Sequence, residues 1–247
     1  MHLTNALAST GRAITASRSV MHFTVRRARE DDIPTIVTIK TESFSDSPYQ
    51  KAIFPDHLRI KPGLQDQLDH YGPRMKRSAQ DPCNYYVVAG VLDESGNEVI
   101  AGFAKWVAPN DGRRAQPAQS QAGTAGTDEA TVKRTPECLD TAAAERSDGE
   151  IAQMMKAAMP LFGDKKLSDM WTLNSIAVDE RYRSRGIGKA LTRWGMDAAD
   201  AEGKDIWLIS APSGRAMYLS LGFQQLAEGS RAGEGQYLMF RETDTRR

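Results

Sequence analysis

Two spacings of apolar residues alternate along the chain, and they predict strands and helices in turn. Residues 23–25 alternate between apolar and polar positions, as in a short strand. Residues 85–92 and 99–107 are rich in aromatic and β-branched side chains and flank a polar turn with a glycine, so they predict a β-hairpin. Residues 223–227 and 236–241 predict a second hairpin that closes the fold.

Apolar residues at helical spacing mark the segments between these strands. Asp31 and Asp32 precede Pro34, which is typical of a helix start because carboxylates accept bonds from the free N–H groups of a first turn. Proline-containing pairs at 47–48 and 55–56 are expected to break the chain after this first helix. Further helices are expected at about 64–75, 142–159, 186–201 and 214–221.

A strand–helix–strand unit lies in the last third of the chain. Residues 170–178 predict a buried strand, and residues 206–210 predict a shorter one. The helix at 186–201 lies between them, with Gly203 as its expected C-terminal stop.

Two segments lack a pattern that builds a core. Between Pro109 and Thr135 the only aliphatic or aromatic residue larger than alanine is Val132. Such a segment cannot bury enough apolar area to offset an ordering cost of roughly 1–2 kcal/mol per residue, so we expect a low-complexity insertion at about 109–141. Residues 1–22 contain arginine but no acidic residue and predict a disordered leader, with a mitochondrial transit peptide as the alternative.

Composition narrows the classes of function. The 247 residues include 32 Lys and Arg against 32 Asp and Glu, and this zero net charge disfavours a dedicated nucleic-acid binder. No run of apolar residues is long enough for a membrane-spanning helix. Two cysteines, Cys83 and Cys138, argue against a disulfide framework and a zinc site. We expect a cytoplasmic monomer or homodimer that works on a small molecule, without nucleic-acid or membrane partners.

The turn that follows the strand at 170–178 has the strongest chemical signal. It carries Arg181, Arg183 and Arg185, and a helix then opens at Gly186-Ile-Gly188. The first turn of a helix has unpaired N–H groups and a partial positive charge, so this segment is expected to bind an anion such as a diphosphate. Its spacing matches neither the Walker pattern nor the dinucleotide pattern. A solvated basic turn that caps an ordinary helix is the alternative.

Two motifs resemble those of the GNAT N-acetyltransferase superfamily. Arg183-Ser-Arg-Gly-Ile-Gly188 is similar to the family's [QR]-x-x-G-x-[GA] motif, and Tyr218-Leu-Ser-Leu-Gly-Phe223 is similar to its Y-x-x-x-G-F segment. Residues 23–28 resemble its opening strand, and residues 100–106 its third strand, particularly in fungal members with a long insertion. The resemblance implies an α/β (α+β) fold over residues 23–247, with a mixed, mostly antiparallel central sheet flanked by helices and a splayed strand pair at the cofactor site.

The resemblance also implies acetyl-CoA as cosubstrate and a role for each matching residue. An N–H group near Ile176 is expected to polarise the thioester carbonyl, and Tyr218 to protonate the departing thiolate, with a core aromatic residue as the alternative for Tyr218. The segment 44–56 is expected to determine specificity, and Trp106 to be either a core residue or part of the acceptor cleft. The implied cofactor-binding residues are Ile176, Ala177, Val178, Arg183, Arg185, Gly186, Ile187, Gly188, Lys189 and Ser213.

The general base is where the match to the family ends. Relatives often carry a carboxylate on the fourth strand, but the comparable positions here are Leu173, Asn174 and Ser175. Asp169, Glu42 or a water molecule are the candidates, and a solvated surface role is the alternative for both carboxylates.

The leading hypothesis is therefore an acyltransferase that moves an acetyl group from acetyl-CoA directly to the primary amine of a small molecule, through a ternary complex. A non-catalytic acyl-CoA-binding module or sensor and a protein N-acetyltransferase are the alternatives.

Overall fold

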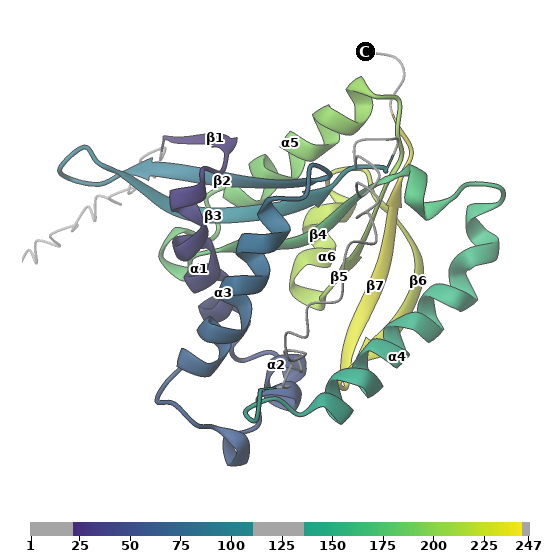
Figure 1. The fold of residues 1–247 in the computed structure, drawn as a ribbon. Helices are drawn as coiled ribbons and strands as arrows, with labels where there is room; N and C mark the ends of the chain where they lie inside the picture. The colour runs from purple at the N-terminus through teal and green to yellow at the C-terminus, as the bar shows by residue number, and fades with distance from the viewer. Residues whose placement is uncertain (1–21, 111–135, 244–247) are drawn as a thin grey trace, which may run out of the picture.

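The strands of this protein form one mixed sheet in the order β1-β2-β3-β4-β5-β7-β6 (Figure 1). The computed structural model describes residues 22–110 and 136–243, so the predicted leader and most of the predicted insertion lie outside the described residues. Only β4 and β5 are parallel neighbours, and the other neighbouring pairs are antiparallel, which confirms the predicted fold class. The strands are β1 (Phe23–Arg27), β2 (Asn84–Leu92), β3 (Glu98–Val107), β4 (Trp171–Val178), β5 (Ile206–Ser210), β6 (Gln224–Arg231) and β7 (Glu234–Arg241).

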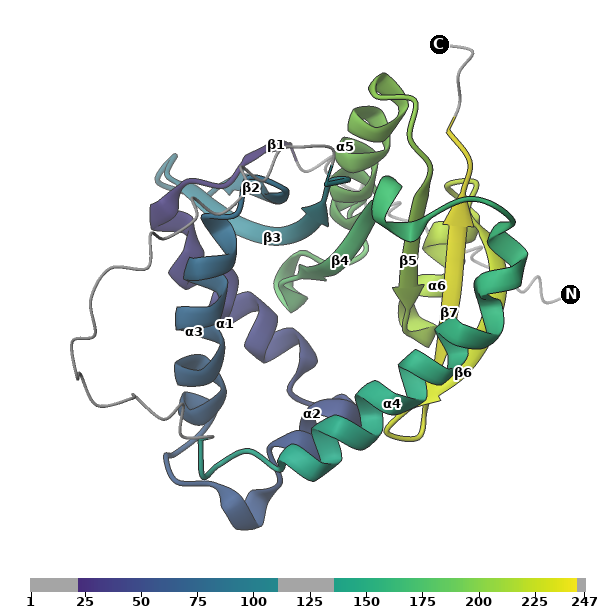
Figure 2. The same ribbon diagram turned by 45° about the vertical axis from the view of Figure 1, so that its right-hand side comes forward.

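Helices cover both faces of this sheet. Along β2, Val88 packs under α1 and α3 whereas its neighbours Val87 and Ala89 pack towards α5, because successive side chains of a strand point to opposite faces. Helix α4 covers β6 and β7 on the face of α1 and α3, and it contacts α2 at one end (Figure 2). The helices are α1 (Ile33–Phe44), α2 (Pro48–Ile53), α3 (Gln65–Ala79), α4 (Thr141–Ala158), α5 (Ile187–Ala201) and α6 (Pro212–Leu219), with short 3₁₀ turns η1 (Glu30–Asp32), η2 (Asp56–Leu58), η3 (Met159–Phe162), η4 (Leu167–Asp169) and η5 (Glu180–Tyr182).

The predicted strands and both hairpins are confirmed, but two details of the helices are corrected. The expected break at 47–48 is instead the start of α2, because the Ser47 hydroxyl accepts a bond from the Gln50 N–H (3.2 Å) and proline suits a first turn. Helix α6 begins at Pro212, two residues before the expected start, because proline suits the first turn of a helix.

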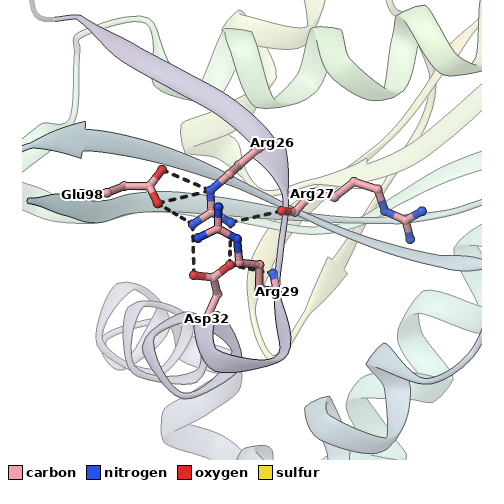
Figure 3. A network of polar contacts seen from close by, with 5 residues as sticks. All are labelled: Arg26, Arg27, Arg29, Asp32 and Glu98. Atoms are coloured by element: carbon pink, nitrogen blue, oxygen red, sulfur yellow. Dashed lines mark hydrogen bonds and ion pairs between the residues drawn. The ribbon is translucent and has the colours of Figure 1, made fainter.

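Asp32 differs from its expected role as a cap of α1. Its carboxylate accepts bonds from the Arg29 N–H (2.7 Å) and from the Arg26 guanidinium (2.7 Å), which also pairs with Glu98 on β3 (2.6 Å) (Figure 3). Burial alone would raise the pKa of Asp32, but these hydrogen bonds outweigh it and hold the pKa below its usual value. The network therefore ties β1, the start of α1 and β3 together.

Trp106 is a core residue. Its side chain is fully buried, its Nε1–H donates to the Leu191 carbonyl (3.2 Å), and its ring lies so close to Gly195 on α5 that a Cβ there would meet it at 2.1 Å. This packing excludes the alternative that Trp106 lines the acceptor cleft. It also explains why α5 has a glycine in its interior despite the cost of about 1 kcal/mol.

Candidate active site at the splayed strands

A cavity of about 890 Å³ lies where β4 and β5 separate. The two strands pair only from Trp171↔Ile206 to Leu173↔Leu208, and Figure 2 shows β4 turning away from β5 beyond this point. The predicted splay is thus present. The cavity is lined by residues of α1, α2, β4, the turn before α5, the start of α5, β5, α6 and the β6–β7 hairpin.

The open edge of β4 carries unpaired N–H groups because of a β-bulge. Ser175 pairs with Lys105 and Leu173 pairs with Trp106, so Asn174 is the extra residue. The N–H groups of residues 171 and 179, eight positions apart, would point to the same edge of a regular strand. They instead donate to opposite edges, to Asp205 (2.9 Å) and Ala101 (2.9 Å) respectively.

The bulge therefore reverses which backbone N–H groups of β4 point to β3 and which point to the β5 side. Because the Asp179 N–H points to β3, the N–H groups of Val178 and Ile176 point to the side where β5 has moved away. The N–H of Ile176 is thus at the open edge, as the sequence predicts, and Asn174 itself is exposed and lines the cavity.

The start of α5 presents another set of unpaired N–H groups to the cavity. The first helical bond joins the Ala190 N–H to the Gly186 carbonyl (3.0 Å), which leaves the N–H groups of residues 187–189 without a partner in the helix. Gly186 has a φ of +86°, a left-handed conformation that favours glycine and that turns the chain into the helix. This is the geometry of an anion site.

Arg183 is held beside this helix start. Its Nε donates to the Val178 carbonyl at the end of β4 (3.1 Å), and its own N–H is already bonded to the Glu180 carbonyl (3.3 Å). Arg183 can thus contribute its guanidinium but not its backbone N–H. Lys189 lines the cavity as well, but Arg185 is exposed and is not among the lining residues.

Tyr218 on α6 is buried, and its ring lies edge-on to Phe223 (5.7 Å between centroids). Burial raises the pKa of its phenol well above the ordinary value, so the hydroxyl remains protonated at neutral pH. Tyr218 belongs to the core and also lines the cavity, so the two interpretations of this residue are compatible. The predicted site residues that the cavity brings together are Ile176, Ala177, Val178, Arg183, Gly186, Ile187, Gly188, Lys189, Ser213 and Tyr218.

The two carboxylates proposed as general base lie elsewhere. Asp169 and Glu42 are exposed, and neither lines the cavity. Among the described residues Glu234, at the start of β7, is the only carboxylate in its lining, and it accepts a bond from the buried Gln236 (3.3 Å). Sequence reasoning missed Glu234 because it lies in a hairpin far from both motifs.

The cavity has two ends, which differ in how they are built. The α5 end consists of the lining residues within 176–189 and 211–218, and the α2 end consists of the lining residues within 40–50 and 231–236. At the α2 end, Lys40 lies over the Tyr71 ring (3.4 Å from Nζ to the centroid). Burial, and secondly the charge of Arg231, lower the pKa of Lys40 to about 8. The α2 end is thus lined by positively charged side chains and the carboxylate of Glu234.

Comparisons with known proteins agree with this geometry. Residues 141–225, from α4 to the start of β6, match the model of the acetyltransferase (GNAT) domain. This segment is a GNAT acetyltransferase domain. Enzymes of this family use acetyl-CoA as the acyl donor, and the match supports acyltransferase activity for this chain.

Several relatives extend the match to most of the chain. An acetyltransferase from Stachybotrys chartarum is 22% identical over 211 residues, which cover 85% of this chain and 84% of the relative. A Corynebacterium glutamicum structure described as histone acetyltransferase HPA2 and related acetyltransferase has a TM-score of 0.56 at 20% identity, and covers 91% of this chain and 98% of that one. The C-terminal condensation domain of Ebony, in complex with β-alanyl-dopamine, has a TM-score of 0.53 at 12% identity, and covers 90% of this chain and 100% of that one. These two structures share the fold of the GNAT domain.

Two further findings concern what the described residues lack. Over residues 22–110 and 136–243 no helix has the length and apolar character needed to cross a membrane. The same residues contain no cluster of histidine, cysteine and carboxylate side chains suited to a metal ion.

Proposed function

We propose that this protein transfers an acetyl group from acetyl-CoA to the primary amine of a small molecule, directly and within a ternary complex. The observation that carries the proposal is a single cavity that joins the unpaired N–H groups of α5, the open edge of β4 and the Tyr218 phenol to a separate α2 end. A continuous cavity allows donor and acceptor to meet without a covalent enzyme intermediate.

The α5 end is the proposed donor site. The N–H groups of residues 187–189 would bind the pyrophosphate, with Arg183 and Lys189 adding attraction from their side chains. The pantetheine arm would pair with the open edge of β4, where the Val178 and Ile176 N–H groups point into the splay. The proposed role of Gly186 and Gly188 is to let the backbone approach this ligand closely, and Ser213 is proposed to contact the ligand from α6.

The transfer itself needs three groups. The acceptor nitrogen attacks the thioester carbonyl carbon, and the Ile176 N–H stabilises the oxyanion that forms. The carbon–sulfur bond then breaks, and Tyr218 donates its proton to the departing thiolate. The acetylated nitrogen loses its remaining extra proton, which returns Tyr218 to its protonated form. Burial keeps the phenol of Tyr218 protonated, so its proton is present when the thiolate departs.

The amine must also lose a proton. An amine with a reference pKa of about 10.4 lies roughly 4.6 kcal/mol from its neutral form at pH 7. We propose that Glu234, directly or through water, accepts this proton, because it is the only carboxylate among the described lining residues. This assignment replaces Asp169 and Glu42.

The remaining parts of the proposal concern organisation. We propose a single catalytic domain from residue 23 onwards, with the segment at about 109–141 as an insertion into it. A cytoplasmic location stays a prediction, supported by two cysteines that are both free and buried.

An acetyl-transfer assay tests the function. CoA thiol release from acetyl-CoA is measured with a panel of small primary amines, and acetyl-CoA binding is measured separately by thermal shift. We expect binding and amine-dependent release of thiol. Binding without release from any amine or polypeptide would favour a non-catalytic acyl-CoA sensor, and the absence of binding would contradict the proposal as a whole.

A further inference from the structure

The α2 end of the cavity contains a lysine without a counter-ion. Lys40 lies on α1 and is mostly buried. Its Nζ lies 3.4 Å from the Tyr71 ring centroid and 5.8 Å from the Phe44 ring centroid. No carboxylate among the described residues forms an ion pair with it. A buried ammonium supported only by aromatic rings keeps much of its desolvation cost, which a bound anion would offset.

A second cation enters the same end of the cavity from the end of β6. Arg231 pairs with Asp148 on α4 (2.7 Å) and stacks on the Tyr49 ring of α2 (3.6 Å), so its guanidinium is fixed in place. Its Nε–H is nevertheless buried without a hydrogen-bond acceptor. A buried donor without a partner typically costs 1–3 kcal/mol, and it points to an acceptor supplied from outside the chain.

The two cations act on one another. Arg231 contributes to the lowered pKa of Lys40, and the other charged or titratable groups around Lys40 are Tyr71 and His70 of α3, with Tyr49 of α2 under Arg231. His70 does not supply a negative charge, and burial lowers its pKa to about 4, so it is neutral at pH 7. Asp148 pairs with Arg231, so Lys40 is the cation at this end whose charge no described carboxylate pairs with, and this charge favours an anionic ligand.

We infer that the acceptor amine also carries an anionic group, most simply a carboxylate, and that this group binds between Lys40 and Arg231. This inference rests on the proposed function and names its substrate class, an amino acid in the general sense of an amine and a carboxylate on one small molecule. The carboxylate would accept from the Lys40 ammonium and from the part of the Arg231 guanidinium that lines the cavity, while the amine faces Tyr218 and Glu234.

Helix α4 holds this part of the site together. Its Glu150 accepts a bond from the Ala232 N–H (2.8 Å), and its Asp148 pairs with Arg231, so α4 fixes the β6–β7 turn from which Arg231 and Glu234 extend. Asp148 and Glu150 are therefore positioning residues for the α2 end.

Matched acceptor pairs test the inference. Thiol release from acetyl-CoA is measured with α-, β- and γ-amino acids and with the amide of each, which has nearly the same size but no negative charge. We expect kcat/KM to be about tenfold or more higher for the acid of the preferred pair. Lys40→Met should raise KM for that acid about tenfold, leave the amide and the acetyl-CoA KM unchanged, and thus abolish the discrimination. Lys51→Met, on the exposed side of α2, is the control and should change nothing.

The outcomes separate this inference from the proposed function. Turnover of amides or uncharged amines at the same rate as acids, or an equal loss for both in Lys40→Met, would overturn the anionic acceptor but leave the acetyltransferase intact. Turnover of polypeptides alone would also overturn it. If no acceptor is turned over, calorimetry of N-acetylamino acids and their amides in the presence of CoA decides the question, and equal affinity would contradict the inference.

Discussion

The two ends of the cavity are built from different parts of the chain. The α5 end is built largely from backbone: N–H groups of consecutive residues at 187–189 and along β4, set by a glycine with positive φ and by a bulge. The α2 end is built from side chains that come from α1, α2, β6 and β7. A backbone site needs only the right local conformation, whereas a side-chain site needs particular residues from distant segments. We therefore expect the chemistry common to the family at the α5 end, and the specificity of this chain at the α2 end.

The largest expected effect concerns Tyr218, where the two ends meet. Tyr218→Phe removes the proposed acid but keeps the ring that packs on Phe223. We expect kcat to fall about a hundredfold or more, with little change in acetyl-CoA affinity, because general acids typically contribute factors of this size. Steady-state kinetics and a binding titration check this. Equal losses in turnover and affinity would reassign Tyr218 to packing alone.

Glu234→Gln should have the next largest effect. The amide keeps the size and can still bond Gln236, but it cannot accept the proton of the amine. We expect kcat/KM for the acceptor to fall about tenfold at pH 7 and to recover partly at high pH, where more of the amine is already neutral. Asp169→Asn is the control, because Asp169 is exposed and does not line the cavity. A pH-independent loss would point to a structural role for Glu234.

Alanine variants of the two glycines that flank α5 distinguish an effect on acetyl-CoA binding from an effect on stability. Gly186 (φ +86°) begins the helix, Gly203 (φ +63°) follows its end, and a Cβ at either position meets nothing within 4 Å. Alanine at each should cost about 1 kcal/mol of stability through strain alone. Only Gly186→Ala should also weaken acetyl-CoA binding, by about fivefold, because it tilts the N–H groups of the first turn. Similar affinities in the two variants would contradict a donor site at the start of α5.

The smallest expected effect is a pH dependence at the α2 end. Lys40, with a pKa lowered to about 8, is a cation below that pH and loses its charge as the pH rises through it. For one acidic acceptor, the ratio of kcat/KM between wild type and Lys40→Met should therefore fall about fourfold from pH 7 to pH 8.5. The ratio cancels the titration of the amine itself. A ratio that stays constant with pH would show that Lys40 does not bind the acceptor in its charged form.

The same contrast explains what could be predicted from the sequence. The α5 end lies within one strand–turn–helix unit, and Gly186, Gly188 and Arg183 lie within six residues of one another, so local spacing was sufficient to find it. The bulge at Asn174 leaves no clear pattern in the sequence, although it determines where the Ile176 N–H points.

The α2 end could not be found in this way. Arg231 and Glu234 reach the cavity because β6 and β7 pair and α4 fixes their turn. Lys40 reaches it because α1 packs on β3 and β4. These are long-range contacts between segments with ordinary local patterns. Asp169 is a candidate in the sequence because it lies just before the fourth strand, and Glu42 because it lies on the first helix. Neither position determines whether the side chain faces the cavity.

The central claim is that the N–H groups at the start of α5 bind the diphosphate of acetyl-CoA. Titration of the ¹⁵N-labelled protein with acetyl-CoA, followed by NMR, measures this directly. The account predicts large shifts of the Ile187, Gly188 and Lys189 amide signals and of the Ile176 signal, with the Gly203 signal unchanged at the far end of the same helix. Saturation of the protein with acetyl-CoA while the amide signals of residues 187–189 stay in place would contradict it.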